Sequence, residues 1–586
     1  MTAAYGTAEA VPLQGLLSTT EANDTAESDY RTCWIHEIDP FCPAPPLHYY
    51  CSCMLPAPRR WYRNPLSLLI VIAALSAFVI QSGELGTSDT SHRLQTTHSW
   101  WTSEPPVFPK EYPEFGIYGR GGKLYSWYGM GQSLLMFPAD VVGTGLEKLP
   151  IFAAYNDTDP TVRAIFVSYT TNTLVNVLTA MICFRFLCQL GFSVKQSVAG
   201  VLALLFCTTH LHYTQNMMEN NYIMLLTLTG LSFQYEWLRS GSGRALLIGS
   251  LAFGLNLLTR LTTGLDLIAG GVFLVLVLWM ENVRGRALWQ RFLTYLKTAL
   301  PVYAIFGLID RLYQLYRFGS LFTNYITIAG QEQRRLNPSL PANYPWEVPF
   351  HVGFLGPLIM PEKSIFLFDP LLLLTIVLAV VAWKHFRFDV RAYLITAFLL
   401  LLGYIGFYAR YTVWSGDFAW GDRYVSTAVE LAAFISVPLL LRARASVGKL
   451  VWWMGISLIV FSTAIQLASL AFWLPLEIYQ EDTLGHPTFV VFLRFKNIAA
   501  FALGKMHAWG LSNDSMTYDP WDYVHIDTWN FLPFLLRRVG EAPRWAVNVT
   551  LAVWGAGLAA LSWALWQLRR VLILIPSEGV VKTRAG

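Results

Sequence analysis

Long apolar runs are the feature that most constrains the fold of this chain. Runs of about 16–22 residues are long enough to cross a bilayer as helices. In lipid, backbone groups have to be paired within the segment, which favours helices. Only 14% of the 586 residues are charged, whereas soluble proteins carry about 25%. We therefore predict an all-α membrane protein with about 12 transmembrane helices. The predicted spans are residues 65–82, 162–185, 194–209, 220–237, 245–260, 262–280, 297–312, 365–383, 391–409, 424–441, 449–472 and 546–568.

The charge of the connecting segments predicts the orientation. Lys and Arg are abundant in alternate short segments, as is typical of cytoplasmic loops. This pattern places both termini in the cytoplasm of a multi-pass plasma (inner) membrane protein. The net charge of only +4 argues against nucleic acid as a partner. The predicted parts are a Cys/Pro-rich cytoplasmic tail (1–64), a transmembrane module (65–472) with a first outer loop (83–161), an extracytoplasmic loop domain (473–545), and a last helix with a cytoplasmic tail (546–586).

The N-terminal tail contains four of the seven cysteines, together with two histidines. They are Cys33, Cys42, Cys51, Cys53, His36 and His48. Thiols and imidazoles bind zinc, but the paired C-x2-C spacing of most structural zinc sites is missing. The competing interpretation is a cytoplasmic tail whose thiols stay reduced.

Ionisable residues collect at the predicted outer ends of the spans, where their cost makes them functional candidates. Asp89 follows the first span and is the candidate catalytic base. Asp also favours helix N-caps, so a capping role is the alternative for Asp89. Arg and Lys favour phosphate, and aromatic rings favour sugar faces or the lipid interface. The candidate substrate-binding residues are Arg93, Arg120, Lys123, Tyr128, Glu219, Lys363, Asp422 and Arg423.

Four sequence segments resemble known membrane glycosyltransferases. They are SDTSHRLQTTHSWW, GKLYSWYGMGQSLLMFP, LGPLIMPEKSIFLFDPLLLL and FAWGDRYV, within residues 65–445. The chain resembles the GT-C superfamily, in particular the bacterial branch of the lipid A aminoarabinose transferase and the protein O-mannosyltransferases. The resemblance implies a polyprenyl-phosphate-linked sugar as donor, an outer-face reaction, and Asp89 as the catalytic carboxylate. The chain departs from the family in having Thr90 where a second acid is common.

The sequence thus predicts an inverting glycosyltransferase that moves a sugar from a polyprenyl-phosphate donor to an acceptor lipid, glycan or protein. No cofactor is predicted with certainty. A divalent metal stays an open alternative that the sequence does not support, because one strong loop carboxylate alone is a poor site, and no metal ligands are predicted. Three alternatives stay open. One is an oligosaccharide or polymer ligase with a lipid pyrophosphate donor, one is a non-catalytic subunit of a membrane complex, and one is a transporter. A transporter is expected to have broken helices and polar residues at mid-membrane, whereas this sequence indicates polar residues at one end of the spans.

Overall fold

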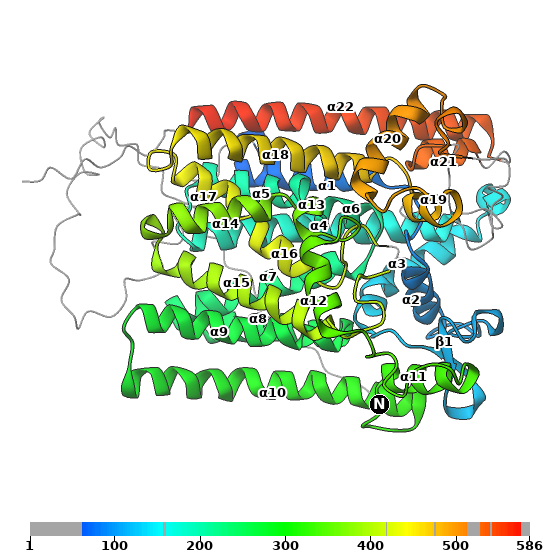
Figure 1. Cartoon of the computed structure of the whole chain (residues 1–586), viewed down its shortest axis with the longest axis horizontal. Helices are drawn as coiled ribbons and strands as arrows, with labels where there is room; N and C mark the ends of the chain where they lie inside the picture. The colour runs from blue at the N-terminus through cyan, green and yellow to red at the C-terminus, as the bar shows by residue number, and fades with distance from the viewer. Residues whose placement is uncertain are drawn as a thin grey trace, which may run out of the picture. The chain divides into compact units, whose positions relative to one another are not determined.

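The computed structural model describes residues 61–155, 160–417, 419–473, 476–512, 528–538 and 542–575. Within these residues the chain is helical apart from short 3-10 turns, irregular loops and one small hairpin. The helices of the bundle lie alongside one another with roughly common direction (Figure 1). The described part of the chain is therefore an all-α membrane protein, as the apolar runs predict.

Six helices are long and apolar enough to cross a membrane on their own. They are α4 (Val162–Gln189), α9 with its leading turn (Leu261–Met280), α10 (Gly285–Phe318), α15 (Phe388–Tyr408), α18 (Lys449–Ser469) and α22 (Arg544–Leu574). Only 6% of the most apolar stretch of α10 is buried inside the molecule. Such a helix has no protein partner for most of its apolar side chains, and lipid is the solvent that suits it.

Further helices pack among these six. The shorter apolar ones are α1 (Pro65–Ile80), α5 (Val194–Cys207), α8 (Gly243–Thr259), α12 (Phe350–Ile359) and α14 (Leu371–Val381). The others inside the bundle are α6 (His210–Gln215), α7 (Glu219–Ser240), α13 (Ile365–Phe368), α16 (Ser426–Ala433) and α17 (Ser436–Arg442). Several of these helices begin at a side-chain cap. At the start of α1, for example, the Asn64 side chain accepts a hydrogen bond from the Leu66 N–H at 2.9 Å.

A helix lies in each of the predicted runs, but the boundaries differ in two ways. Helix α10 begins at Gly285, well before the predicted start at residue 297, because the helix continues through a polar stretch that hydropathy does not detect. The runs 365–383 and 424–441 each contain two helices rather than one. These interruptions matter because polar side chains gather beside them.

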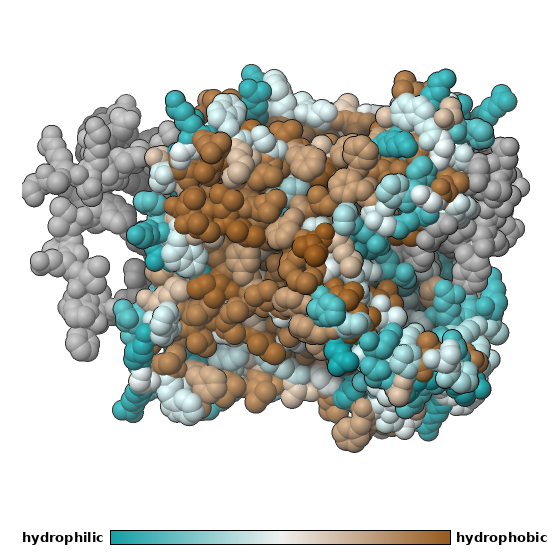
Figure 2. Space-filling view, in the orientation of Figure 1, coloured by the Kyte–Doolittle hydropathy of each residue, from teal (hydrophilic) through white to brown (hydrophobic). Residues whose placement is uncertain are grey.

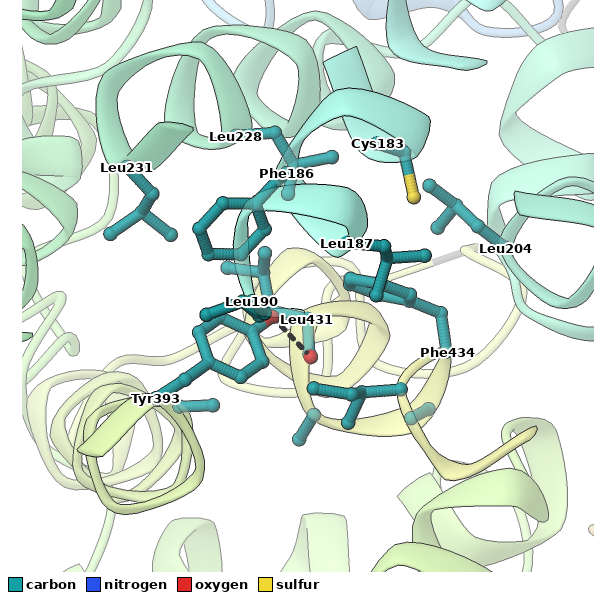
Figure 3. Packing of buried hydrophobic residues seen from close by; sticks show 14 of the residues in the cluster. Cys183, Phe186, Leu187, Leu190, Leu204, Leu228, Leu231, Tyr393, Leu431 and Phe434 are labelled. Atoms are coloured by element: carbon teal, nitrogen blue, oxygen red, sulfur yellow. Dashed lines mark hydrogen bonds between the residues drawn. The ribbon is translucent and has the colours of Figure 1, made fainter. Parts of the chain in front are cut away.

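The core is formed by apolar side chains from α4, α5, α7, α15, α16 and α17. Phe186, Leu187, Leu204, Leu228 and Phe434 are fully buried and pack together (Figure 3). The Tyr393 hydroxyl in this view is satisfied, since it donates to the Leu431 carbonyl oxygen at 2.7 Å. Buried aromatic groups of this kind need such a partner in an apolar interior.

The loops at one end of the bundle contain structure of their own. Figure 2 shows a broad apolar surface over the helices, with hydrophilic residues near both ends. The elements at the end that carries the long loops are α2 (Ser88–His98), β1 (Gly116–Tyr118), β2 (Leu124–Ser126), α3 (Gly131–Glu147), α11 (Tyr325–Leu336), α19 (Leu476–Leu484), α20 (Val490–Ala502) and α21 (Leu532–Arg538). Strands β1 and β2 pair antiparallel, with Ile117 opposite Tyr125. Helix α2 is the element that positions the candidate base.

Candidate functional site

Helix α2 holds Asp89 and Arg93 on one face, because residues four apart in a helix are neighbours. The helix is capped by Thr87, whose hydroxyl accepts a bond from the Thr90 N–H at 3.4 Å. Asp89 lies in the first turn of α2 and not at its N-cap. The alternative prediction, that Asp89 caps the helix, is therefore wrong. The Thr90 hydroxyl donates to the Met217 carbonyl oxygen at 2.9 Å and attaches α2 to the start of α7.

The Asp89 carboxylate is held by two side chains from distant parts of the chain. The Tyr128 hydroxyl donates to Oδ1 and the Arg423 guanidinium donates to Oδ2, each at 2.6 Å. Burial disfavours the charged form, but the positive charges of Arg423 and Arg93 outweigh it, so the pKa of Asp89 lies below its ordinary value. The side chain is still 16% exposed. Asp89 is therefore an ionised carboxylate that a small group from outside can reach.

A second carboxylate, Glu219, lies next to Asp89 and is also neutralised by arginines. Arg93 Nη1 is 2.7 Å from Glu219 Oε2, and Arg260 pairs with the other oxygen. The Arg93 guanidinium also lies over the Tyr128 ring, 4.3 Å from its centroid. Asp89, Arg93, Glu219, Arg260 and Arg423 thus form one continuous network, which we call the outer cluster.

The outer cluster has a surplus of positive charge, because three arginines face two carboxylates. The Nε atom of Arg423 is buried and has no hydrogen-bond partner among the described residues. A buried guanidinium donor without a partner is costly, and Arg presents several donors in a fork that matches a phosphate. The cluster is therefore suited to receive one further anionic group.

Aromatic rings line one side of the outer cluster. The Tyr424 ring lies 5.3 Å from the Arg423 guanidinium and 5.2 Å from that of Arg260. Tyr408 stacks on Tyr424 with ring centroids 4.4 Å apart. Rings in this position hold the two cations by cation–π attraction and present flat surfaces of the kind that pack on sugars.

Lys363 supports the loop that carries Arg423. Its ammonium group donates to the carbonyl oxygens of Asp417, Ala419 and Gly421 at 2.5, 2.9 and 3.5 Å. It is only 1% exposed, and burial lowers the pKa of Lys363 to about 8. Because an ammonium has three N–H donors, Lys363 has none to spare for a phosphate. Its position indicates that it holds the 417–423 loop instead of contacting a substrate.

Asp422 lies in this loop and differs from Asp89 in its charge. Oδ1 accepts a bond from the Tyr424 N–H at 3.0 Å, while Oδ2 is buried without a hydrogen-bond partner in the described residues. Burial raises the pKa of Asp422 to about 7. Asp422 is therefore partly protonated at neutral pH and is the weaker candidate for a permanently charged group.

Two of the predicted substrate-binding residues belong neither to the outer cluster nor to the side chains described above that support it. Arg120 and Lys123 are exposed on the turn between β1 and β2. In the part of the chain that the structure describes, neither forms an ion pair with Asp89 or Glu219. Proximity along the sequence grouped them with Asp89, but the structure places both on an exposed turn of the hairpin.

Arg260 is a residue of the site that was not selected from the sequence. The structure brings it to Glu219 because α7 and α8 are antiparallel neighbours, so the start of α7 meets the end of α8. Tyr408 and Tyr424 were also missed, since tyrosines at membrane surfaces are common. The sequence signal for this residue was its position, because Arg260 directly follows the apolar run that forms α8.

A cavity of about 210 Å³ lies on the other side of α2. Ser91 and Gln95 line it, and these residues project from the helix face opposite Asp89. A molecule bound there is separated from the Asp89 carboxylate by the width of α2. The cavity is therefore distinct from the outer cluster.

The described residues also contain polar groups deep in the bundle, which corrects the expectation that polar residues lie only at one end of the spans. Thr209, His210, Asp369 and Glu430 are 0–2% exposed and lie beside the interruptions between α5 and α6 and between α13 and α14. We call these four residues the inner cluster. The sequence missed it because these polar residues belong to three separate segments of the chain, and only folding brings them together.

No group of three or more His, Cys, Asp or Glu side chains in the described residues is placed to hold a metal ion. The cysteines and histidines of the N-terminal tail lie outside the described residues. No protein-family model matches this chain, and no curated protein matches it.

Proposed function

We propose that the chain is a membrane glycosyltransferase of the GT-C type, with about 12 membrane crossings and both termini in the cytoplasm. Its donor is a sugar linked to polyprenyl phosphate and its acceptor is a hydroxyl group at the outer face. The observation that carries this proposal is the ionised Asp89 carboxylate within a cluster that has surplus positive charge. The four sequence segments that resemble the GT-C superfamily support it independently.

The reaction requires a base and a stabilised leaving group. The acceptor oxygen forms a bond to the anomeric carbon as the bond from that carbon to the phosphate oxygen breaks, and the configuration inverts. The hydroxyl proton passes to Asp89, and the bonding electrons leave with the polyprenyl phosphate. Arginines beside the leaving group offset its growing charge, a contribution of roughly 3–4 kcal/mol per well-placed donor.

The contact between Asp89 and Arg423 gives this reaction an order. While Arg423 is bound to Asp89, it lowers the pKa of the carboxyl group and makes it a weak base. A donor phosphate competes for the same guanidinium. When Arg423 turns to the phosphate, Asp89 loses its strongest stabilising charge and becomes more basic. Donor binding thus prepares the base, and the site is inert towards the acceptor until the donor arrives.

An assay of donor binding and transfer with one variant tests the proposal. In purified protein, Asp89→Asn is expected to bind the polyprenyl-phosphate sugar and to transfer it poorly. The control is Glu332→Gln, which alters an ion pair with Arg335 on α11, away from the outer cluster. Mass spectrometry of lipids from a deletion strain identifies the donor sugar and the acceptor. Transfer at the wild-type rate by Asp89→Asn is incompatible with the proposal.

The proposed orientation has its own test. Ser339 and Ser446 are exposed and belong to loops at opposite ends of the bundle. In a background without the seven native cysteines, Ser339→Cys is expected to react with an impermeant reagent in intact cells, and Ser446→Cys only after permeabilisation. The reverse pattern would invert the topology.

Transport is the second candidate function, and the inner cluster is the observation that favours it. Buried polar groups beside interrupted helices are the arrangement expected of a transporter. A transporter moves its substrate across the membrane unchanged, so the appearance of a new glycosidic product distinguishes the two functions.

A further inference from the structure

The inner cluster brings two carboxyl groups together, and among the described residues neither forms an ion pair with a Lys or an Arg. Asp369 lies between α13 and α14, and Glu430 lies on α16. Among the described residues, the ion-pair partner of Glu430 is His210, and Asp369 has none. Two ionised carboxylates in an apolar interior would cost far more than their hydrogen bonds return.

The depth of the cluster follows from its contacts with two spanning helices. His210 Nε2 lies 3.0 Å from the side-chain oxygen of Asn176, near the middle of α4. The Asn176 amide in turn donates to the Ala73 carbonyl oxygen at 2.7 Å, in the middle part of α1. The cluster therefore lies well inside the bundle and away from both ends of these helices.

The single hydrogen of the Thr209 hydroxyl group limits the charge that the carboxyl pair can carry. The Thr209 hydroxyl oxygen is 3.0 Å from Asp369 Oδ2 and 3.0 Å from Glu430 Oε1. A hydroxyl has one hydrogen to donate, so it satisfies only one of these oxygens. The other contact is attractive only if that carboxyl group carries a proton and donates it to the hydroxyl oxygen. One proton is therefore required between Asp369 and Glu430.

The tautomer of His210 leaves a place for a second proton. Asn176 uses its amide N–H on a carbonyl oxygen, so its oxygen faces His210 Nε2 and requires a hydrogen there. His210 Nδ1 then faces Glu430 Oε2 at 3.8 Å. Both atoms are buried and have no hydrogen-bond partner among the described residues. A proton on Nδ1 turns two opposed acceptors into an imidazolium–carboxylate pair.

We infer that Asp369, Glu430 and His210 form a proton-binding site inside the membrane, with one proton on a carboxyl group beside Thr209 and a second exchanged at His210 Nδ1. Bare carboxylates and a neutral imidazole would carry a charge of about −2. The first proton removes one negative charge and the second makes the site neutral. The ligand is the proton itself, and the inference does not depend on the proposed glycosyl transfer.

The proton site is connected to the loop that bears Arg423. Tyr213 on α6 interacts electrostatically with Asp369 and Glu430. Its hydroxyl donates to the Trp420 carbonyl oxygen at 2.9 Å, three residues before Arg423. Tyr213 is thus a further titratable group beside the site, contributed by α6. A change in proton occupancy thus has a short route to the outer cluster.

Infrared difference spectroscopy of the full chain in nanodiscs tests the first proton. In Asp369→Asn or Glu430→Gln, the new amide N–H replaces the acid O–H as donor to Thr209, so either variant keeps the fold and the charge. We expect wild type minus each variant to show one carboxylic acid band that shifts in D2O. The matched control is Asp389→Asn, because Asp389 is fully buried but paired with Arg387 at 2.8 Å and Tyr235 at 3.0 Å.

Wild type minus Asp389→Asn should contain no such band. Absence of the band from both inner-cluster differences would mean that both carboxylates are ionised, with a bound cation such as Na⁺ in place of the proton, and would overturn the inference. Nitrogen-15 NMR of histidine-labelled protein, assigned with His210→Gln, tests the second proton. His210 should carry a proton on Nε2, which faces Asn176, and exchange a second proton on Nδ1, which faces Glu430; a His210 whose Nδ1 is never protonated contradicts the exchange.

Discussion

The outer and inner clusters each bring a pair of carboxyl groups together, but different partners neutralise them. Arginines from α2, the α8 end and the 417–423 loop surround Asp89 and Glu219. Thr209 and His210 are the partners of Asp369 and Glu430. A guanidinium beside a carboxylate keeps it ionised. A hydroxyl group supplies no positive charge, so in an apolar interior the state of lowest free energy is a protonated carboxyl group. Under the two proposals, the same residue types therefore supply a base in one place and a proton-binding site in the other.

The largest effect is expected for Asp89→Asn. The amide keeps the size of the side chain and still bonds an acceptor hydroxyl, but it cannot take the proton. Turnover should fall by about two to four orders of magnitude, while donor binding survives. A single-turnover transfer assay beside a donor-binding measurement separates the two effects. Because Thr87 caps α2, a near-normal rate could not be explained by a retained cap and would remove Asp89 from the reaction.

The next effect concerns stability. Glu219→Gln leaves Arg93 and Arg260 buried without their shared counter-charge, which typically costs about 3–5 kcal/mol. Thermal unfolding in detergent should show a clear loss relative to wild type. Glu332→Gln is the matched control, because its partner Arg335 is largely exposed and such pairs contribute about 0–1 kcal/mol. Equal melting temperatures for the two variants would show that the outer cluster is not held by charge.

Arg423→Ala is expected to reduce transfer by at least about tenfold, since a lost transition-state contact of 1.4 kcal/mol already has that effect. Arg423→Lys should recover only part of the rate, because Lys lacks the fork that binds two phosphate oxygens. Arg120→Ala should stay within about twofold, as Arg120 is exposed on the hairpin. A loss in Arg120→Ala and none in Arg423→Ala would move the phosphate site to the hairpin.

The pH dependence of stability tests the protonation of Asp422. This residue lies beside the arginines of the outer cluster but is partly protonated at neutral pH. Burial raises its pKa to about 7, so the folded state binds more protons than the unfolded chain between about pH 4 and 7. The stabilising contribution is complete below the unfolded pKa and is lost as the pH rises through about 7. Wild type should therefore lose stability relative to Asp422→Asn over this window, by roughly 1–3 °C in melting temperature. Parallel melting profiles would contradict the raised pKa.

The smallest effect is expected for Asp369→Asn. The amide imitates a protonated acid, so its cost should be below about 1 kcal/mol, whereas Asp369→Ala removes the partner of the Thr209 N–H and should cost about 1–3 kcal/mol. Thermal unfolding of the two variants measures the difference. If Asn is as harmful as Ala, Asp369 is ionised and the contrast between the two clusters disappears.

Prediction from the sequence succeeded for elements that depend on local composition. The start of α1 at Pro65, of α4 at Val162 and of α18 at Lys449 agrees with the predicted spans. The resemblance and the position after the first span singled out Asp89, and Glu219, Asp422 and Arg423 were chosen as outer-end residues. The contact of Asp89 with Arg423 joins positions 334 residues apart, and no local pattern contains that information.

From the amino-acid sequence alone one can predict helices that are long and apolar enough to cross a membrane, because apolar runs in lipid have one way to satisfy their backbone. The sequence also determined which ionisable residues stand at the ends of the runs. Only the tertiary structure decided which of these meet, since helix neighbours are set by packing between segments far apart in the chain. It placed Arg260 on Glu219, turned Lys363 towards backbone carbonyls, and joined Asp369 to Glu430 through one hydroxyl. The charge that each acid carries depends on these neighbouring side chains, and the order of residues along the chain does not specify which neighbours each acid has.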